Sequence, residues 1–266
     1  LIGVVVVLKR MSYIGHGLSH SIFGGAVVSY VIGVNFYIGA GLWGFMSALL
    51  INAATRKRKI GADAAIGIVT TASFAIGVAL ISKVRTFTRN FDAALFGNIL
   101  GVNAGDLLII GAVLVAALLA LFFGYKQLLF STFDPEIAPS YGVPSAWVDT
   151  FFSLTLAATI IASMQVMGVT LIAASIVIPP ITARMLTDSF PRMLCLSSVI
   201  GAACGFLGMF ISYYLDISSG ASIVLFSALM FVVVGSAGWV FSQLRPEKRL
   251  KLQHRLGRRE AADLFD

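Results

Sequence analysis

The chain of 266 residues is 58% hydrophobic and only 12% charged, with a mean hydropathy of +0.94, which excludes an ordinary soluble domain. Its apolar runs are continuous rather than alternating, so they predict membrane-spanning α-helices and not the strands of a β-barrel. The net charge of +7 does not indicate nucleic-acid binding, because seven of the 19 Lys and Arg residues lie within 245–266 and four form the run 56–59.

Nine apolar runs divide the chain, and each crossing of a bilayer needs roughly 20 residues. The first run is short, so we interpret it as the end of a helix, which gives about eight or nine transmembrane helices in an all-α, polytopic fold. Residues 1–243 form one transmembrane domain in this interpretation, and 244–266 form a basic tail. The runs cover 1–8, 12–34, 36–55, 63–82, 104–125, 146–166, 168–187, 192–215 and 221–243.

The basic residues predict the orientation of the chain. With the tail in the cytoplasm, alternation of the helices puts sixteen of the 19 Lys and Arg residues on the cytoplasmic side. Only Lys83, Arg85 and Arg89 fall outside, in the segment 83–103, which is apolar enough for a short interfacial or re-entrant helix. Short loops rich in Lys and Arg stay in the cytoplasm, so we expect a multi-pass protein of the cell membrane with a cytoplasmic C-terminus.

The segment 133–144, with the sequence FDPEIAPSYGVP, lies on the cytoplasmic side in this topology. Acidic residues around a proline, as in Asp134-Pro135-Glu136, are typical of a helix start. Gly142 and Pro144 are typical of a helix end. We therefore expect a short amphipathic helix parallel to the membrane, on which a soluble partner can dock.

His16 and His20 are the candidate metal ligands. Their spacing puts both imidazoles on one face of the helix predicted over 12–34, close enough to bind one divalent ion. Two histidines are an incomplete ligand set, and the alternative is a pair that packs or hydrogen-bonds between helices. The spacing also matches the zinc-protease motif H-E-x-x-H, but Gly17 stands where that motif needs its general-base Glu. With no phosphate-binding loop G-x-x-x-x-G-K-[ST] either, the sequence predicts neither a protease nor an ATPase.

Pro179 and Pro180 fall inside the apolar run 168–187. A proline pair in a helix interior removes backbone hydrogen bonds, so we predict a helix break with a role in gating, as in the broken helices of transporters. A simple packing kink is the alternative.

Five segments resemble, in order, the permease subunits of bacterial ABC importers for zinc, manganese or iron. They extend over the chain from its start to about residue 242, and their agreement in order is far more specific than any one of them. The segments are VVLKRMSYIGHGLSHSIFGGAVVSY (6–30), FGNILGV (96–102), FDPEIAPSYGVP (133–144), MGVTLIAASIVIPPITARMLT (167–187) and SYYLDISSGASIVL (212–225).

The resemblance implies a fold like that of the vitamin B12 importer permease, and a homodimer that forms the translocation pathway. It implies ABC ATPase subunits on the cytoplasmic face, an extracytoplasmic metal-binding protein, no permanently bound cofactor and Zn²⁺, Mn²⁺ or Fe²⁺ as cargo. The family's metal ligands are an Asp and a His four residues apart, at the positions of His16 and His20. Imidazole in place of a carboxylate favours Zn²⁺ or Fe²⁺ over Mn²⁺.

The resemblance also assigns the segment 133–144 to ATPase docking. Two alternatives remain open: a permease of the same architecture for a metal chelate or vitamin, and an ATP-independent channel or secondary carrier. A carrier of that kind normally places several ionisable residues in mid-membrane. The residues expected to couple to the ATPase are Phe133, Asp134, Pro135, Glu136, Ala138, Gly142, Val143 and Pro144.

Overall fold

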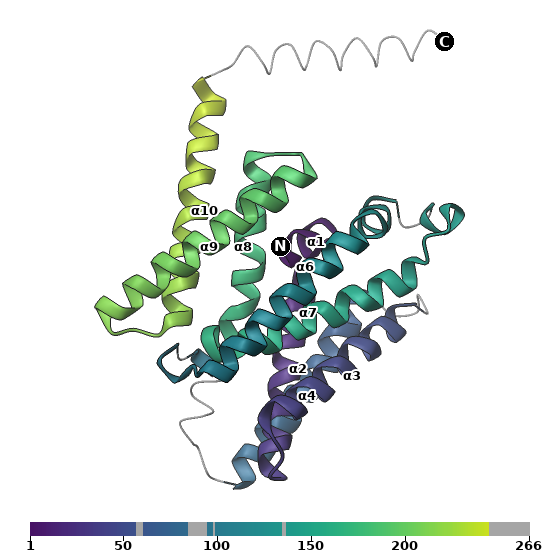
Figure 1. The fold of residues 1–266 in the computed structure, drawn as a ribbon, viewed down its shortest axis with the longest axis vertical. Helices are drawn as coiled ribbons and strands as arrows, with labels where there is room; N and C mark the ends of the chain where they lie inside the picture. Colours follow the sequence, from purple (N-terminus) through teal and green to yellow (C-terminus); the bar gives the residue numbers. More distant parts are fainter. Residues whose placement is uncertain (57–60, 85–94, 98, 135–136, 245–266) are drawn as a thin grey trace.

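The computed structural model describes residues 1–56, 61–84, 95–97, 99–134 and 137–244. No strand occurs in these ranges, and nine α-helices lie entirely within them (Figure 1). The all-α prediction is confirmed. The helices are α1 (Ile2–Leu8), α2 (Ser12–Val31), α3 (Phe36–Arg56), α4 (Ala62–Val84), α6 (Ala104–Phe133), α7 (Ser145–Met167), α8 (Val169–Leu186), α9 (Phe190–Leu215) and α10 (Ser219–Leu244), with the 3-10 turns η1 (Ile99–Gly101) and η2 (Ala138–Tyr141) between them.

The helices follow the predicted runs closely, and seven of them, α3, α4 and α6 to α10, are long and apolar enough to cross a membrane. The main difference is α6, which continues to Phe133, past the predicted end at residue 125. Residues 126–133 contain no helix breaker and the next proline is Pro135, so nothing in the sequence stops the helix earlier. Of the segment 83–103, in which a short outer helix was expected, residues 85–94 and 98 lie outside the described part.

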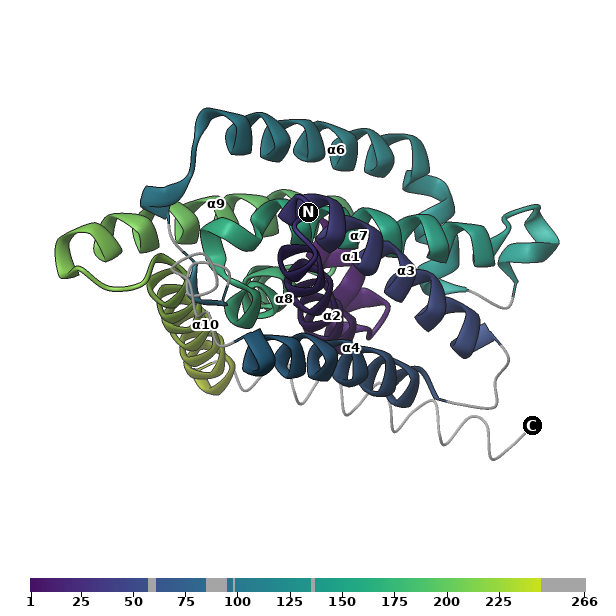
Figure 2. The same cartoon turned by 90° about the horizontal axis from the view of Figure 1, so that it is seen from below.

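The position of α2 explains why it is less apolar than the spanning helices. It packs against α3, α4, α7 and α8 in the middle of the bundle, so it offers little surface to lipid (Figure 2). The helix α6 is the opposite case and runs along one edge of the bundle, with α4 on the other side of α2 (Figure 2). Only four residues of α6 are buried: Asp106, Ala117, Leu128 and Ser131.

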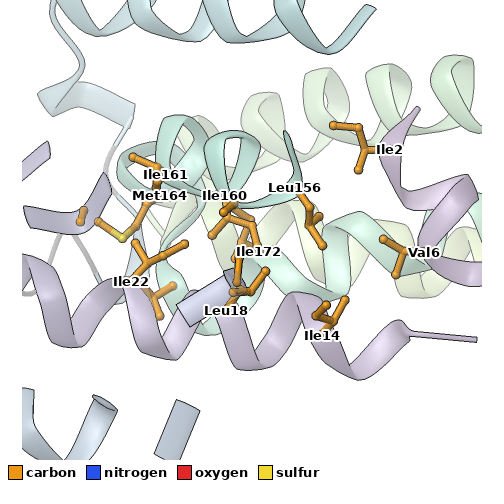
Figure 3. Close-up of a cluster of buried hydrophobic side chains, with 14 of the residues drawn as sticks. Ile2, Val6, Ile14, Leu18, Ile22, Leu156, Ile160, Ile161, Met164 and Ile172 are labelled. Atoms are coloured by element: carbon orange, nitrogen blue, oxygen red, sulfur yellow. The ribbon is translucent and has the colours of Figure 1, made fainter. Parts of the chain in front are cut away.

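The hydrophobic core lies where α2 meets α7 and α8. Leu18 and Ile22 of α2 are fully buried together with Ile160 of α7 and Ile172 of α8 (Figure 3). Lipid is as apolar as these side chains, so helix association depends on close packing more than on the hydrophobic effect. Gly24 illustrates this packing, because a Cβ at that position would lie 2.2 Å from the carbonyl oxygen of Ser73 in α4.

The predicted helix break at Pro179 and Pro180 is wrong. Both prolines lie buried inside the continuous helix α8. A proline at 180 cannot donate to the carbonyl of Ile176, and Gly3 of α1 packs directly on that carbonyl, where any side chain would collide with it. The contact of a glycine Cα with the freed carbonyl offsets part of the lost hydrogen bond. The proline pair therefore forms a packing site for α1, and its role in gating stays a prediction.

Candidate metal centre

The two predicted histidine ligands meet on one face of α2. Nε2 of His16 lies 3.2 Å from Nε2 of His20, and the two rings are nearly perpendicular, with centroids 4.4 Å apart. One turn of regular helix is enough to bring them together. Without metal, one of the facing nitrogens donates and the other accepts, since two facing N–H groups would repel each other.

The same separation suits a shared metal ion. Zinc–nitrogen bonds of about 2.0–2.1 Å at a tetrahedral angle hold two donor nitrogens about 3.3 Å apart. The pair at 3.2 Å therefore matches the spacing of two imidazole ligands, with the ion in place of the shared proton. Six-coordinate ions have longer bonds but smaller angles between ligands, so the distance by itself does not select among metals.

The helix α4 forms a wall behind the pair. The ring of Phe74 contacts His20 edge-on, with centroids 4.9 Å apart. The approach of α4 depends on Gly17, where a Cβ would lie 2.5 Å from Cγ2 of Ile66 and 2.8 Å from Cγ2 of Thr70. Nδ1 of His20 is buried and finds no hydrogen-bond partner among the described residues. On the Nδ1 side, packing against Phe74 rather than a hydrogen bond therefore orients this ring, unlike the tightly held histidines of permanent metal sites.

Two histidines do not complete a metal site. In the described part of the chain, no three side chains of His, Cys, Asp or Glu come together in a group that could hold a metal ion. Further ligands have to come from outside these residues: from water, from a second copy of the chain or from another protein. Tyr13, 53% exposed and with its ring 5.7 Å from that of His16, marks the open side of the pair.

The predicted docking segment connects α6 to α7, and its described residues form a single 3-10 turn in place of the expected helix. Asp134 is the C-terminal cap of α6, with its N–H donating to the carbonyl of Phe130, and does not start a new helix. Pro135 and Glu136 lie outside the described residues. A single 3-10 turn, η2, follows, and it ends as predicted at Gly142, whose φ of 75° suits glycine best.

The remaining residues of the segment form a closed turn with an apolar exterior. Ala138 is fully buried, and its carbonyl accepts the N–H of Val143, while Pro144 is the N-terminal cap of α7. Large exposed apolar side chains clustered on a connecting turn are typical of a protein interaction site. Four such side chains lie in or beside the segment, each about half exposed or more: Phe133, Ile137, Tyr141 and Trp147.

An ion pair at the base of the docking segment was not predicted from the sequence. Nζ of Lys9 lies 2.5 Å from Oδ1 of Asp149 and 3.0 Å from Oγ of Ser131. Lys9 had been counted only among the charges that set the topology. The sequence did contain a signal for this ion pair, because Lys9 directly follows an apolar helix and a buried ammonium group needs a partner.

A second polar contact joins α3 and α6 at their N-terminal ends. The hydroxyl of Tyr37 donates to the carboxylate of the buried Asp106 at 2.6 Å. Asp106 also accepts the backbone N–H of Asn103, which completes a capping box at the start of α6. The start of α3 is thereby fixed to the start of α6.

Spanning helices arranged around a central helix with an open histidine pair define a polytopic, all-helical membrane protein. The model of the ABC 3 transport family matches residues 1–237, and the chain belongs to this family. It is 37% identical over 251 residues to the manganese transport system membrane protein MntC of Listeria monocytogenes, covering 92% of this chain and 89% of that protein. The resemblance to permeases of metal importers is therefore confirmed.

Two further comparisons agree with this family. A probable iron transport system membrane protein of Haemophilus influenzae is 36% identical over 234 residues, which cover 88% of this chain and 86% of that protein. Among solved structures, PsaBC from Streptococcus pneumoniae in complex with Fab aligns with a TM-score of 0.78 and 34% identity. That alignment covers 88% of this chain and 84% of the solved chain.

Proposed function

We propose that this chain is the membrane-spanning permease subunit of an ATP-driven importer for a divalent transition metal. The observation that carries the proposal is the pair of imidazole nitrogens 3.2 Å apart on the central helix α2. Similar proteins are named for the transport of manganese and of iron. Imidazole ligands suit Fe²⁺ and Zn²⁺ better than Mn²⁺, so Fe²⁺ is the metal that both considerations favour.

The proposal includes a homodimer. One copy supplies only two histidines, and a second copy facing it would supply two more, so that an ion on the path between them meets up to four imidazoles. A small number of loosely oriented metal ligands suits a transporter, because the ligands have to release the ion for transport to continue. Among the described residues the buried Nδ1 of His20 has no hydrogen-bond partner, which supports such loose binding.

The partners of the proposed importer lie at opposite ends of the helices. ABC ATPase subunits dock on the segment 133–144, on the cytoplasmic side with the basic tail. An extracytoplasmic metal-binding protein docks at the outer ends of α7 to α10. The residues there are held together by hydrogen bonds from Thr170 Oγ1 to the carbonyl of Leu95 and from Ser218 Oγ to the carbonyl of Phe96.

Metal uptake by the reconstituted complex tests this function. The chain is inserted into proteoliposomes with its ATPase and its metal-binding protein, and uptake of radioactive iron, manganese and zinc is measured with and without ATP. The double variant His16→Ala/His20→Ala should lower ATP-dependent uptake by about tenfold or more, because both protein ligands are lost. Tyr13→Phe is the matched control on the same helix face and should leave uptake near that of the unmodified chain.

The outcomes separate the competing functions. Undiminished uptake by the double histidine variant would refute the ligand role. Uptake that needs no ATP would favour a channel or secondary carrier, and uptake of a metal chelate in place of the free ions would favour a chelate permease.

A further inference from the structure

A polar connection between the docking segment and the helix that carries the histidines runs through the side chain of Lys9. It follows the last residue of α1, and its side chain is only 8% exposed. The ammonium group donates to the Asp149 carboxylate at 2.5 Å, to Ser131 Oγ at 3.0 Å and to the carbonyl of Ser131 at 3.4 Å. All three hydrogens of the ammonium group therefore have an acceptor within reach.

The two partners of Lys9 flank the docking segment on either side. Ser131 lies in the last turn of α6, and Asp149 lies in the second turn of α7. Residues 134–144 leave the first helix and enter the second between these two positions. A partner that binds this segment therefore acts next to the two helix ends that Lys9 connects.

On its other side, Lys9 leads directly into α2. The N–H of Arg10 donates to the carbonyl of Val7 and the N–H of Met11 to that of Val6, which closes a tight turn at the end of α1. Arg10 has a φ of 55°, in the left-handed region that a residue other than glycine enters only at a cost. Because α2 begins at Ser12, only the hydrogen-bonded turn of Arg10 and Met11 separates Lys9 from the helix that carries His16.

We infer that Lys9 is the positioning residue through which movement of the docking segment reaches the metal-binding helix. The inference rests on the proposed function and adds to it the route of coupling between the ATPase and the ions. The contacts connect the end of α6 and the start of α7 to the start of α2 by hydrogen bonds and one ion pair, through the turn of Arg10 and Met11.

The unequal burial of the ion pair explains why the connection would persist during movement. Lys9 is almost inaccessible to water, whereas the side chain of Asp149 is 45% exposed. An ammonium group in such a place has no water to replace a lost carboxylate, so separating the pair is costly. Asp149 stays partly hydrated, so loss of its partner costs it less. Lys9→Met is therefore the variant that breaks the connection without leaving a buried charge unpaired.

The ratio of metal taken up to ATP hydrolysed tests the inference in the same reconstituted complex. Lys9→Met should still assemble with the ATPase and hydrolyse ATP, while uptake per ATP falls by about tenfold, the size of a typical coupling between two sites. Lys9→Arg keeps the charge and the donors and should restore most of the ratio. Lys126→Met removes the same charge from an exposed position on α6 and serves as the matched control, with an unchanged ratio expected.

A ratio that stays at the unmodified value in an assembled Lys9→Met complex would overturn the inference. If Lys9→Met does not assemble, Ser131→Ala removes one of the three acceptors of the Lys9 ammonium group, together with the hydroxyl's own hydrogen bond to the carbonyl of Leu128, and should lower the ratio by about threefold. An unchanged ratio in Ser131→Ala would then overturn it equally. An unmodified complex that takes up none of the three metals would contradict the proposed function itself, so the two failures are distinguishable.

Discussion

Replacing Gly24 with alanine should force α2 away from α4. The new Cβ would lie 2.2 Å from the backbone carbonyl oxygen of Ser73, whereas ordinary contacts begin at 3.4 Å. The helices must therefore separate by about 1.2 Å, and no change of rotamer can relieve a collision with backbone. Overpacking of this kind costs about 1–3 kcal/mol. Alanine also gains up to about 1 kcal/mol over glycine as a helix former, which partly conceals the cost.

A second substitution on the same helix removes this ambiguity. Gly15 also lies in α2, but a Cβ there would have nothing within 4 Å. The gain in helix propensity is common to Gly15→Ala and Gly24→Ala, so the difference between the two variants reports the packing term alone. Thermal unfolding in detergent, followed by tryptophan fluorescence, should separate their Tm values by several degrees, at about 2–4 °C per kcal/mol.

The same pair of variants should also differ in transport. Gly24 lies one turn beyond His20, and Ser73 precedes Phe74, the aromatic wall of the histidine pair. Separating the helices here moves that wall, so Gly24→Ala should lower metal uptake while Gly15→Ala does not. Equal Tm values for the two variants would refute the close approach of α2 to α4.

Two predictions concern the buried polar contacts. Asp149→Asn should destabilise the protein more than Lys9→Met, because it leaves the less exposed partner, the Lys9 ammonium group, without its counter-charge. The difference should lie within the cost of an unpaired buried charge, about 3–5 kcal/mol. The Tm values of the two variants check the order, and equal values would contradict it. Tyr37→Phe should lower the free energy of unfolding by about 1.5–3 kcal/mol, since it removes a hydrogen bond to the buried carboxylate of Asp106. A Tm equal to that of the unmodified chain would contradict this.

The helices could be predicted from the sequence because each spanning segment is apolar over most of its length and its charges lie near its ends. The proximity of His16 and His20 could also be predicted from the sequence, since it depends only on the local geometry of one helix. Their role as metal ligands stays a prediction until uptake is measured.

Contacts between distant parts of the chain could not be predicted in this way. Lys9 and Asp149 are 140 residues apart, and no local pattern relates them. The proline pair was misjudged for a related reason: the effect of Pro180 on α8 depends on Gly3, which belongs to another helix and fits against the freed carbonyl. A prediction made from α8 alone includes the lost hydrogen bond but not the contact with Gly3.

The extra length of α6 has a consequence for the geometry of the proposed complex. Its apolar part, up to residue 125, is about 33 Å long and matches a hydrocarbon core of about 30 Å. From Lys126 to Phe133 the helix continues for about 12 Å more, which is enough to pass through the headgroup layer. The helix would thus hold the docking segment clear of the lipid surface, and an ATPase would reach it in water without first displacing headgroups.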